Sequence, residues 1–178
     1  MNYFIQLLTY FRILIAPVIF LLIVQLNFYG LALILFVVAC ISDYWDGFLA
    51  RKYNLESLIG AVLDPIADKI LITFIILATS IELSSPFIGF IGGIILVREF
   101  WVGALRELNA RNANINATKV SKLAKVKTSI QLGTFCLYLL GLYLSSALMV
   151  FVENFFLFLA LIITLQTGLS YTISTFKK

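Results

Sequence analysis

Histidine is absent from this 178-residue sequence, and charged residues make up only 12% of it. Without histidine, the chain lacks the commonest general base and the commonest ligand of transition metals, so acid–base chemistry falls to carboxylate, lysine, tyrosine or water. Its two cysteines, Cys40 and Cys136, are far apart and form no C-x-x-C pattern, which favours buried thiols over a disulfide or a zinc site. Soluble globular domains contain about 25% charged residues. The composition therefore excludes that class.

Long apolar runs, with a mean hydropathy of +1.05, predict an all-α polytopic membrane protein. A bilayer core about 30 Å thick takes roughly 20 apolar residues per helix, and the length of the chain favours one domain, residues 1–178. Pro86 suits the first turn of the fourth helix, with the preceding serine as its cap. The six transmembrane helices are expected near residues 4–26, 30–50, 57–81, 86–108, 126–147 and 152–174.

Lysine and arginine are distributed unevenly between the two ends of these helices. The breaks at 27–29, 82–85 and 148–151 contain neither residue, whereas the opposite ends and the 109–122 loop are basic. The positive-inside rule then places both termini and that loop in the cytoplasm. Because the basic residues are juxtamembrane, anionic membrane lipid is their expected partner, and nucleic acid is not.

All four aspartates of the chain lie within one segment. Asp43 and Asp46 share a face of the second helix, and Asp64 and Asp68 are spaced by four in the third. A short connection makes the two helices antiparallel neighbours, so the four carboxylates can meet. An aspartate near the centre of a membrane helix costs about 2.5–3.5 kcal/mol, so this cluster requires a compensating cation. An oxygen-only site suits Mg²⁺, Mn²⁺ or Ca²⁺, and two ions are usual where phosphoryl oxygens are clamped.

Each of these residues also has a structural interpretation. Asp64 stands before a proline, as an N-cap does when proline occupies the first helical position. Asp43 could be a surface residue, and Asp68 could pair with Lys69 or Arg51. The glycines nearby permit the close approach of a ligand, or serve helix packing alone.

Residues 43–68 follow the pattern D-x2-D-G-x2-A-R-x8-G-x3-D-x3-D. This pattern resembles the signature of the CDP-alcohol phosphatidyltransferases, without a gap or a substitution. The resemblance implies the fold of that family: a six-helix enzyme of the cell (inner) membrane, usually a homodimer, whose active site faces the cytoplasm. It also implies transfer of a phosphatidyl group from CDP-diacylglycerol to an alcohol, with release of CMP. The matching residues are Asp43, Asp46, Gly47, Ala50, Arg51, Gly60, Asp64 and Asp68.

Further segments resemble bacterial members of this family that use sn-glycerol 3-phosphate as the acceptor. In the first of these segments, Thr9 and Arg12 stand in the relation usual for the family, which makes them further candidate contacts. The last two helices carry no such likeness and are generic apolar spans. The similar segments are residues 7–17, 63–69, 97–106 and 125–128.

The resemblance implies a role for each matching group. Asp68 is the expected general base, which takes the proton of the acceptor hydroxyl, and is also counted among the metal contacts. Two ions, Mg²⁺ or Mn²⁺, would bridge the diphosphate of CDP-diacylglycerol and neutralise charge on the leaving CMP. The expected metal ligands are Asp43, Asp46, Asp64 and Asp68. The expected nucleotide-binding residues are Gly47, Ala50, Arg51 and Gly60.

The dianionic phosphate of the acceptor requires cations. Arg98 and Arg106 lie about 80° apart around the fourth helix, so they share a broad face. Lys125 and Lys127 lie at the start of the fifth helix, where the helix dipole disfavours cations unless an anion binds. These four residues are the expected phosphate site. The alternatives are pairing of Arg98 with Glu99, snorkelling of Arg106, and positive-inside anchoring by the two lysines.

Two other functions remain open. The acceptor could be phosphatidylglycerol, serine, inositol phosphate or a choline-type alcohol. Intramembrane carboxylates also mark ion paths, so a divalent-cation transporter is the alternative from another class. A path through the membrane favours acidic groups at several depths, whereas the aspartates cluster in one half, with Glu82 and Glu153 expected beyond the far ends of the helices.

Overall fold

Six α-helices make up the part of the chain that the computed structural model describes, residues 2–53, 58–111 and 122–177. No strand occurs within these ranges, so the prediction of an all-α protein is confirmed. The helices are α1 (Asn2–Val24), α2 (Tyr29–Tyr53), α3 (Leu58–Glu82), α4 (Pro86–Arg111), α6 (Lys122–Leu144) and α7 (Ala147–Phe176).

The helix ends lie within a few residues of the predicted ranges, except in the last hairpin. The predicted break at 148–151 is wrong, because α7 begins at Ala147 and the turn occupies Ser145 and Ser146. Residues 148–151 are all apolar, whereas serine competes with the helix by bonding to nearby backbone groups. As a result, Glu153 lies inside α7 and is 2% exposed, instead of beyond the end of a helix.

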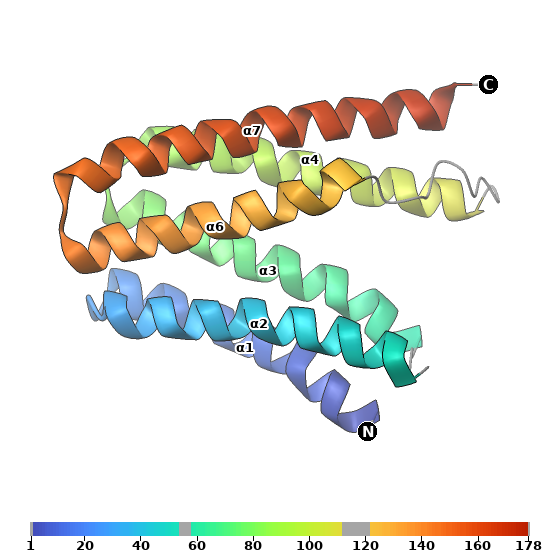
Figure 1. The fold of residues 1–178 in the computed structure, drawn as a ribbon, viewed down its shortest axis with the longest axis horizontal. Helices are drawn as coiled ribbons and strands as arrows, with labels where there is room; N and C mark the ends of the chain where they lie inside the picture. The colour runs from blue at the N-terminus through green and yellow to red at the C-terminus, as the bar shows by residue number, and fades with distance from the viewer. Residues whose placement is uncertain (1, 54–57, 112–121, 178) are drawn as a thin grey trace.

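The α1–α2, α3–α4 and α6–α7 connections lie together at one end of the bundle (Figure 1). Each contains a non-glycine residue with positive φ, namely Asn27 at 55°, Ser84 at 46° and Ser145 at 49°. A left-handed residue is the usual way to end a helix and reverse the chain. At the start of α4, the Ile88 N–H donates to Ser85 Oγ at 3.4 Å, which confirms the predicted serine cap before the proline.

The core is built by packing between consecutive helices and between helices that are distant in sequence. Helix α1 contacts α2 and α3, α4 contacts α3 and α7, and α6 contacts α2 and α7. This arrangement leaves the start of α1 and the end of α7 at the same end of the molecule, opposite the three connections (Figure 1). The core includes the fully buried side chains of Ile23, Phe36, Ile75, Ile95, Phe135 and Leu157.

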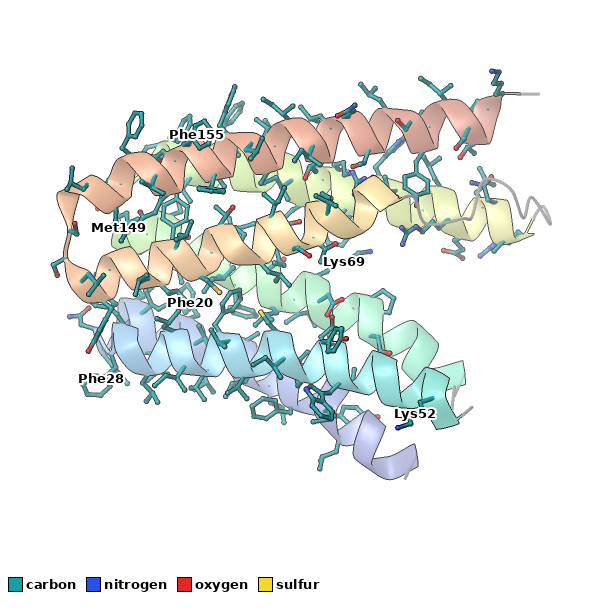
Figure 2. All side chains as sticks on the ribbon, viewed as in Figure 1. Phe20, Phe28, Lys52, Lys69, Met149 and Phe155 are labelled. Carbon is teal, nitrogen blue, oxygen red and sulfur yellow. The ribbon has the colours of Figure 1, made fainter. Side chains whose placement is uncertain are left out.

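Large apolar side chains also cover the outside of the bundle. Leu148 is 84% exposed and Phe151 is 79% exposed, and Phe28 and Phe155 project from the outer surface (Figure 2). Apolar surface of this extent is not stable in water. Among the described residues, three helical segments are long and apolar enough to cross a bilayer, namely Leu7–Val24, Pro86–Arg111 and Leu148–Phe176. The chain is therefore a membrane protein.

Candidate active site

Arg12 of α1 lies at the meeting point of three predicted aspartates. Its side chain is completely buried, and Nη1 donates to Asp43 Oδ1 at 2.5 Å and to Asp68 Oδ1. Nη2 donates to Asp64 Oδ1 at 3.3 Å. Asp43 belongs to α2 and the other two to α3, so the packing of α1 against both helices brings the guanidinium to the carboxylates. The convergence predicted from the spacing is thus present for these three residues.

Thr9 lies one turn before Arg12 on the same helix and contacts the same cluster. Its Oγ1 donates to Asp64 Oδ1 at 2.7 Å. Both candidate contacts of the first helix are therefore in the site. A threonine and an arginine at this spacing share a helix face, which explains how one helix supplies both groups.

Two structural interpretations of the aspartates are wrong. Asp64 is no N-cap, because α3 begins at Leu58 and the proline after Asp64 lies inside the helix. Asp43 is no isolated surface residue, since its half-buried carboxylate pairs with Arg12. The sequence also allowed Asp68 to pair with Lys69. In the structure Asp68 pairs with Arg12, and the ammonium of Lys69 lies 5.1 Å from the centroid of the Phe100 ring.

The charges of this cluster do not balance. In the ion pairs of the described residues, three carboxylates share one guanidinium, so negative charges outnumber the positive one. The carboxylates are between one third and one half exposed, so they are accessible to a ligand. Their donor atoms are all oxygen, and this chemistry fits a divalent cation. Among the described side chains, no group of acidic residues is ready to hold an ion, because Arg12 lies between them.

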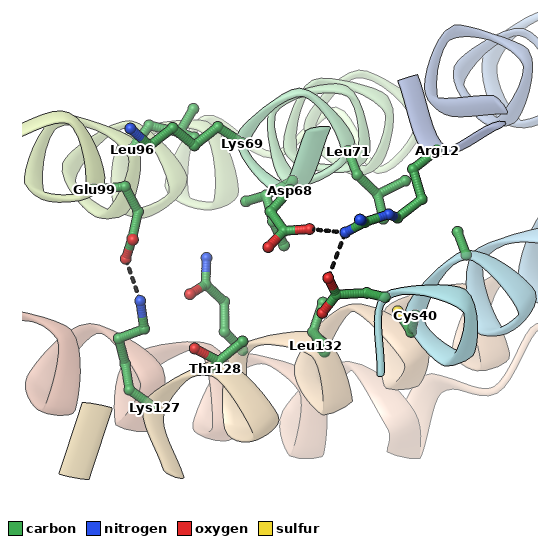
Figure 3. A pocket seen from close by; sticks show the side chains of 14 residues that line it. Arg12, Cys40, Asp68, Lys69, Leu71, Leu96, Glu99, Lys127, Thr128 and Leu132 are labelled. Atoms are coloured by element: carbon green, nitrogen blue, oxygen red, sulfur yellow. Dashed lines mark hydrogen bonds and ion pairs between the residues drawn. The ribbon is translucent and has the colours of Figure 1, made fainter. Parts of the chain in front are cut away.

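A cavity of about 100 Å³ extends from this cluster into the bundle. Arg12 and Asp68 lie on one side of it, and Glu99 and Lys127 lie on the other (Figure 3). Five helices therefore contribute to one polar space. Its polar lining residues are Arg12, Asp43, Asp68, Lys69, Glu99, Lys127, Thr128 and Gln131.

On the far side of the cavity, two cations share one carboxylate. Lys127 Nζ donates to Glu99 Oε1, and Arg98 Nη1 donates to the same oxygen at 3.0 Å. The alternative pairing of Arg98 with Glu99 is therefore confirmed. Arg98 is 7% exposed and Lys127 is 6% exposed, so both charges are buried and depend on this contact.

The predicted phosphate site is only partly assembled in this structure. Lys127 lines the cavity, while Arg98 lies behind Glu99 and turns its other nitrogen, Nη2, toward α7. Arg106 is exposed and donates to the Tyr171 hydroxyl at 3.2 Å, with its guanidinium 5.2 Å from the ring centroid. Of these four cations, Lys127 is the one that lines the cavity.

Several predicted residues have side chains outside the described part of the structure. Their backbones lie in α2 and α6. Gly60 lies in the first turn of α3. The residues outside the described part are Asp46, Gly47, Ala50, Arg51 and Lys125.

The sequence did not predict that Glu99 lines the cavity. Sequence reasoning treated it only as a partner for Arg98, although a carboxylate inside a membrane helix is itself a signal of function. Thr128 and Gln131 of α6 were also missed. Lys127 and Gln131 are four residues apart and share the face of α6 that lines the cavity, and this spacing was the available signal.

Comparison with known proteins identifies the family of this chain. The model of the family described as CDP-alcohol phosphatidyltransferase matches residues 5–166. A relative named CDP-diacylglycerol--glycerol-3-phosphate 3-phosphatidyltransferase from Rickettsia typhi is 38% identical over 170 residues, and the match covers 92% of each chain. A relative of the same name from Rickettsia felis is 39% identical over 167 residues, 92% of this chain and 90% of its own. Another, from Escherichia coli, is 36% identical over 129 residues, 71% and 70% of the two chains. The chain belongs to the CDP-alcohol phosphatidyltransferase family.

Proposed function

We propose that this chain transfers the phosphatidyl group of CDP-diacylglycerol to sn-glycerol 3-phosphate, giving phosphatidylglycerophosphate and CMP in phospholipid biosynthesis. The observation that carries the proposal is that one cavity is lined both by Arg12 with its aspartates and by Lys127. One side of this cavity has excess negative charge and the other holds a buried ammonium. Relatives that cover nearly the whole chain carry the name of this reaction.

Asp68 is the proposed general base. The acceptor hydroxyl attacks the phosphorus that carries diacylglycerol, a new P–O bond forms, and the P–O bond to CMP breaks. The hydroxyl proton passes to the Asp68 carboxylate, which lines the cavity and is about half exposed. With no histidine in the chain, a carboxylate is the natural candidate for this step.

Members of the family are generally dependent on divalent cations. In this chain, Asp43, Asp46, Asp64 and Asp68 would hold two divalent ions, either Mg²⁺ or Mn²⁺. Bound there, they polarise the phosphoryl oxygens and neutralise charge on the departing CMP. The excess negative charge around Arg12 is the feature that supports this assignment.

The remaining binding roles follow the motif and the cavity. Lys127 binds the phosphate of sn-glycerol 3-phosphate from the far side of the cavity. Thr9 and Arg12 contact the aspartates. The predicted nucleotide-binding residues are Gly47, Ala50, Arg51 and Gly60. The other predicted cations of the phosphate site are Arg98, Arg106 and Lys125.

In the membrane, the chain forms one domain whose six helices all span the bilayer. Its basic residues gather at the end of the bundle where α1 begins and α7 ends, so this end lies in the cytoplasm. The aspartates occupy the half of the bundle nearer that end. We infer that the protein resides in the inner cell membrane with its active site open to the cytoplasm, and that it forms a homodimer, as the family resemblance implies.

An assay with purified protein tests this proposal. The protein is supplied with CDP-diacylglycerol, with Mg²⁺ or Mn²⁺, and with a panel of acceptors, and the lipid product is identified by mass spectrometry. We expect phosphatidylglycerophosphate and CMP in equal amounts with sn-glycerol 3-phosphate. Turnover only with serine, phosphatidylglycerol or inositol phosphate would reassign the acceptor. Uptake of metal ions into proteoliposomes without CMP formation would point instead to transport.

A further inference from the structure

Helix α7 is more than the generic apolar span that its sequence predicted. A row of polar contacts joins it to α4, which runs beside it in the same direction (Figure 1). The contacts begin in the buried part of both helices and continue toward their C-terminal ends. The pairs are Arg98 with Thr167, Trp101 with Thr172, Arg106 with Tyr171, and Asn109 with Thr175.

Thr167 is the innermost member of this row, and its hydroxyl has a defined orientation. Its Oγ1 lies 2.8 Å from the carbonyl oxygen of Ile163 and 3.0 Å from that of Thr164, so its single proton is donated within α7. The lone pairs of Oγ1 are then left to accept, and Arg98 Nη2 donates to this atom at 2.6 Å. Thr167 is 2% exposed, so water does not substitute for the contact.

Arg98 depends on this hydroxyl for its position. Nη1 donates to Glu99, Nη2 donates to Thr167, and the buried Nε has no hydrogen-bond partner among the described residues. The side chain also passes close to Gly168. A β-carbon at that position would lie 3.0 Å from Arg98 Cγ and 3.1 Å from Nε. Thr167 and Gly168 together therefore define the path that Arg98 follows toward Glu99.

The position of Arg98 decides how much positive charge faces the cavity. Glu99 and Lys127 alone form a neutral pair, which has little attraction for an anion. When Arg98 shares the same carboxylate oxygen, the group of three carries one net positive charge. Lys127 is the member of this group that lines the cavity as a cation, so the surplus charge is available to an incoming phosphate.

We infer that Thr167, with Gly168 beside it, is a positioning residue on α7 that keeps Arg98 on Glu99 and thereby supplies the surplus positive charge with which Lys127, itself bonded to Glu99, binds the acceptor phosphate. This inference rests on the proposed function. It adds a third helix, α7, to the α4 and α6 residues of the acceptor site, although no described residue of α7 lines the cavity. It also separates the roles of the two cations, because Arg98 acts through Glu99 whereas Lys127 meets the acceptor.

The test compares two threonine variants of the full-length protein. Thr167→Val keeps the shape of the side chain and removes the acceptor for Arg98, and we expect the KM for sn-glycerol 3-phosphate to rise about tenfold, as for the loss of one hydrogen bond to a charged group. The KM for CDP-diacylglycerol and kcat should change by less than about twofold. Thr167→Ser keeps the hydroxyl and should restore the KM. The matched control is Thr172→Val, which removes the bond from Trp101 Nε1 at 3.0 Å and leaves Arg98 untouched.

Two glycine variants, Gly168→Ala and Gly93→Ala, test the same role if Thr167→Val does not fold. Gly168→Ala retains the Thr167 hydroxyl but crowds Arg98, and it should raise the same KM by about threefold or more. Gly93→Ala on α4 is the control, because a β-carbon there would meet nothing within 4 Å among the described residues. The midpoint of thermal unfolding, measured for every variant, separates loss of fold from loss of acceptor binding.

Each outcome has a distinct meaning. Equal effects of Thr167→Val and Thr172→Val, or equal rises in both KM values, would overturn the positioning role while the proposed function stands. If the wild type uses another phosphorylated acceptor, the same KM ratio is measured with that acceptor, and a selective rise supports the inference. Turnover by the wild type with unphosphorylated alcohols alone would overturn both the proposed acceptor and this inference.

Discussion

The two sides of the cavity have opposite charge arrangements. On the side of α1, α2 and α3, three carboxylates surround one buried guanidinium. On the side of α4 and α6, a buried guanidinium and a buried ammonium share one carboxylate. Arg12 is the one positive charge of the first group, and Glu99 is the one negative charge of the second. Figure 3 shows Arg12 beside Asp68 and Glu99 beside Lys127.

The two charge arrangements favour different ligands. A group with excess negative charge attracts cations, and a group with excess positive charge attracts an anion. Arg12 stabilises the first group and Glu99 the second in the absence of ligand, because buried like charges without a counter-ion are strongly unfavourable. In the proposed function, the acidic side meets the metal ions and the diphosphate, and the basic side meets the acceptor phosphate.

The largest expected effect is that of Asp68→Asn. The amide keeps the size of the side chain but cannot take the acceptor proton, so CMP release should fall about 10³-fold. Binding of labelled CDP-diacylglycerol to the purified variant should change little, since the other aspartates remain. Full turnover by this variant would remove Asp68 from the mechanism.

Lys127→Met should act on the opposite side of the cavity. The variant keeps the apolar stem and loses the charge, so the KM for sn-glycerol 3-phosphate should rise about 10- to 100-fold. The KM for CDP-diacylglycerol, measured in the same assay, should rise far less. Lys177→Met at the exposed end of the chain is the control and should leave both values unchanged. An equal rise in both would show that the two sides do not bind separate substrates.

Arg12→Gln tests whether the guanidinium of Arg12, the one positive charge among the three carboxylates, competes with metal ions. Without nucleotide, the variant should bind Mn²⁺ about tenfold more tightly, because a neighbouring positive charge has been removed. Electron paramagnetic resonance of free Mn²⁺ measures this affinity without any turnover. Arg111→Gln, at an exposed pair with Glu107, provides the control. Weaker binding by Arg12→Gln would mean that Arg12 mainly orients the carboxylates.

Glu153→Gln should have the smallest effect. Its carboxylate is buried in α7 beside Gly141, at the end of the bundle that holds the α6–α7 connection. Its Oε1 has no hydrogen-bond partner among the described residues, so an amide of the same shape loses no contact there. Both KM values and kcat should stay within about twofold of the wild type. A selective change in either KM would extend the site beyond the two sides of the cavity.

The aspartate cluster could be predicted because its members are close in sequence. Asp43 and Asp64 lie on consecutive helices, so the spacing within each helix and a short connection are enough to bring them together. The same holds for the serine cap at the start of α4. Such contacts depend on helix geometry, which residue type and order determine locally.

The partners of these residues could not be predicted in the same way. Arg12 is 31 residues from Asp43 and 56 from Asp68, and Thr167 is 69 residues from Arg98. These contacts require knowledge of which helix lies beside which. In a helix that is apolar on every side, the sequence carries little information about the face that meets a neighbour, because lipid and protein are equally apolar.

For this protein, the order of residues determined the helices and the acidic motif. A bilayer requires every backbone group to be bonded within its own segment, so long apolar runs must form helices whatever their neighbours are. The counter-ions depend on tertiary structure. Arg12 meets the aspartates through the packing of α1 on α2 and α3, and α4 and α6 bring Glu99 to Lys127. The packing of α7 on α4 brings Thr167 to Arg98, because only the docking of distant helices places one charge beside another.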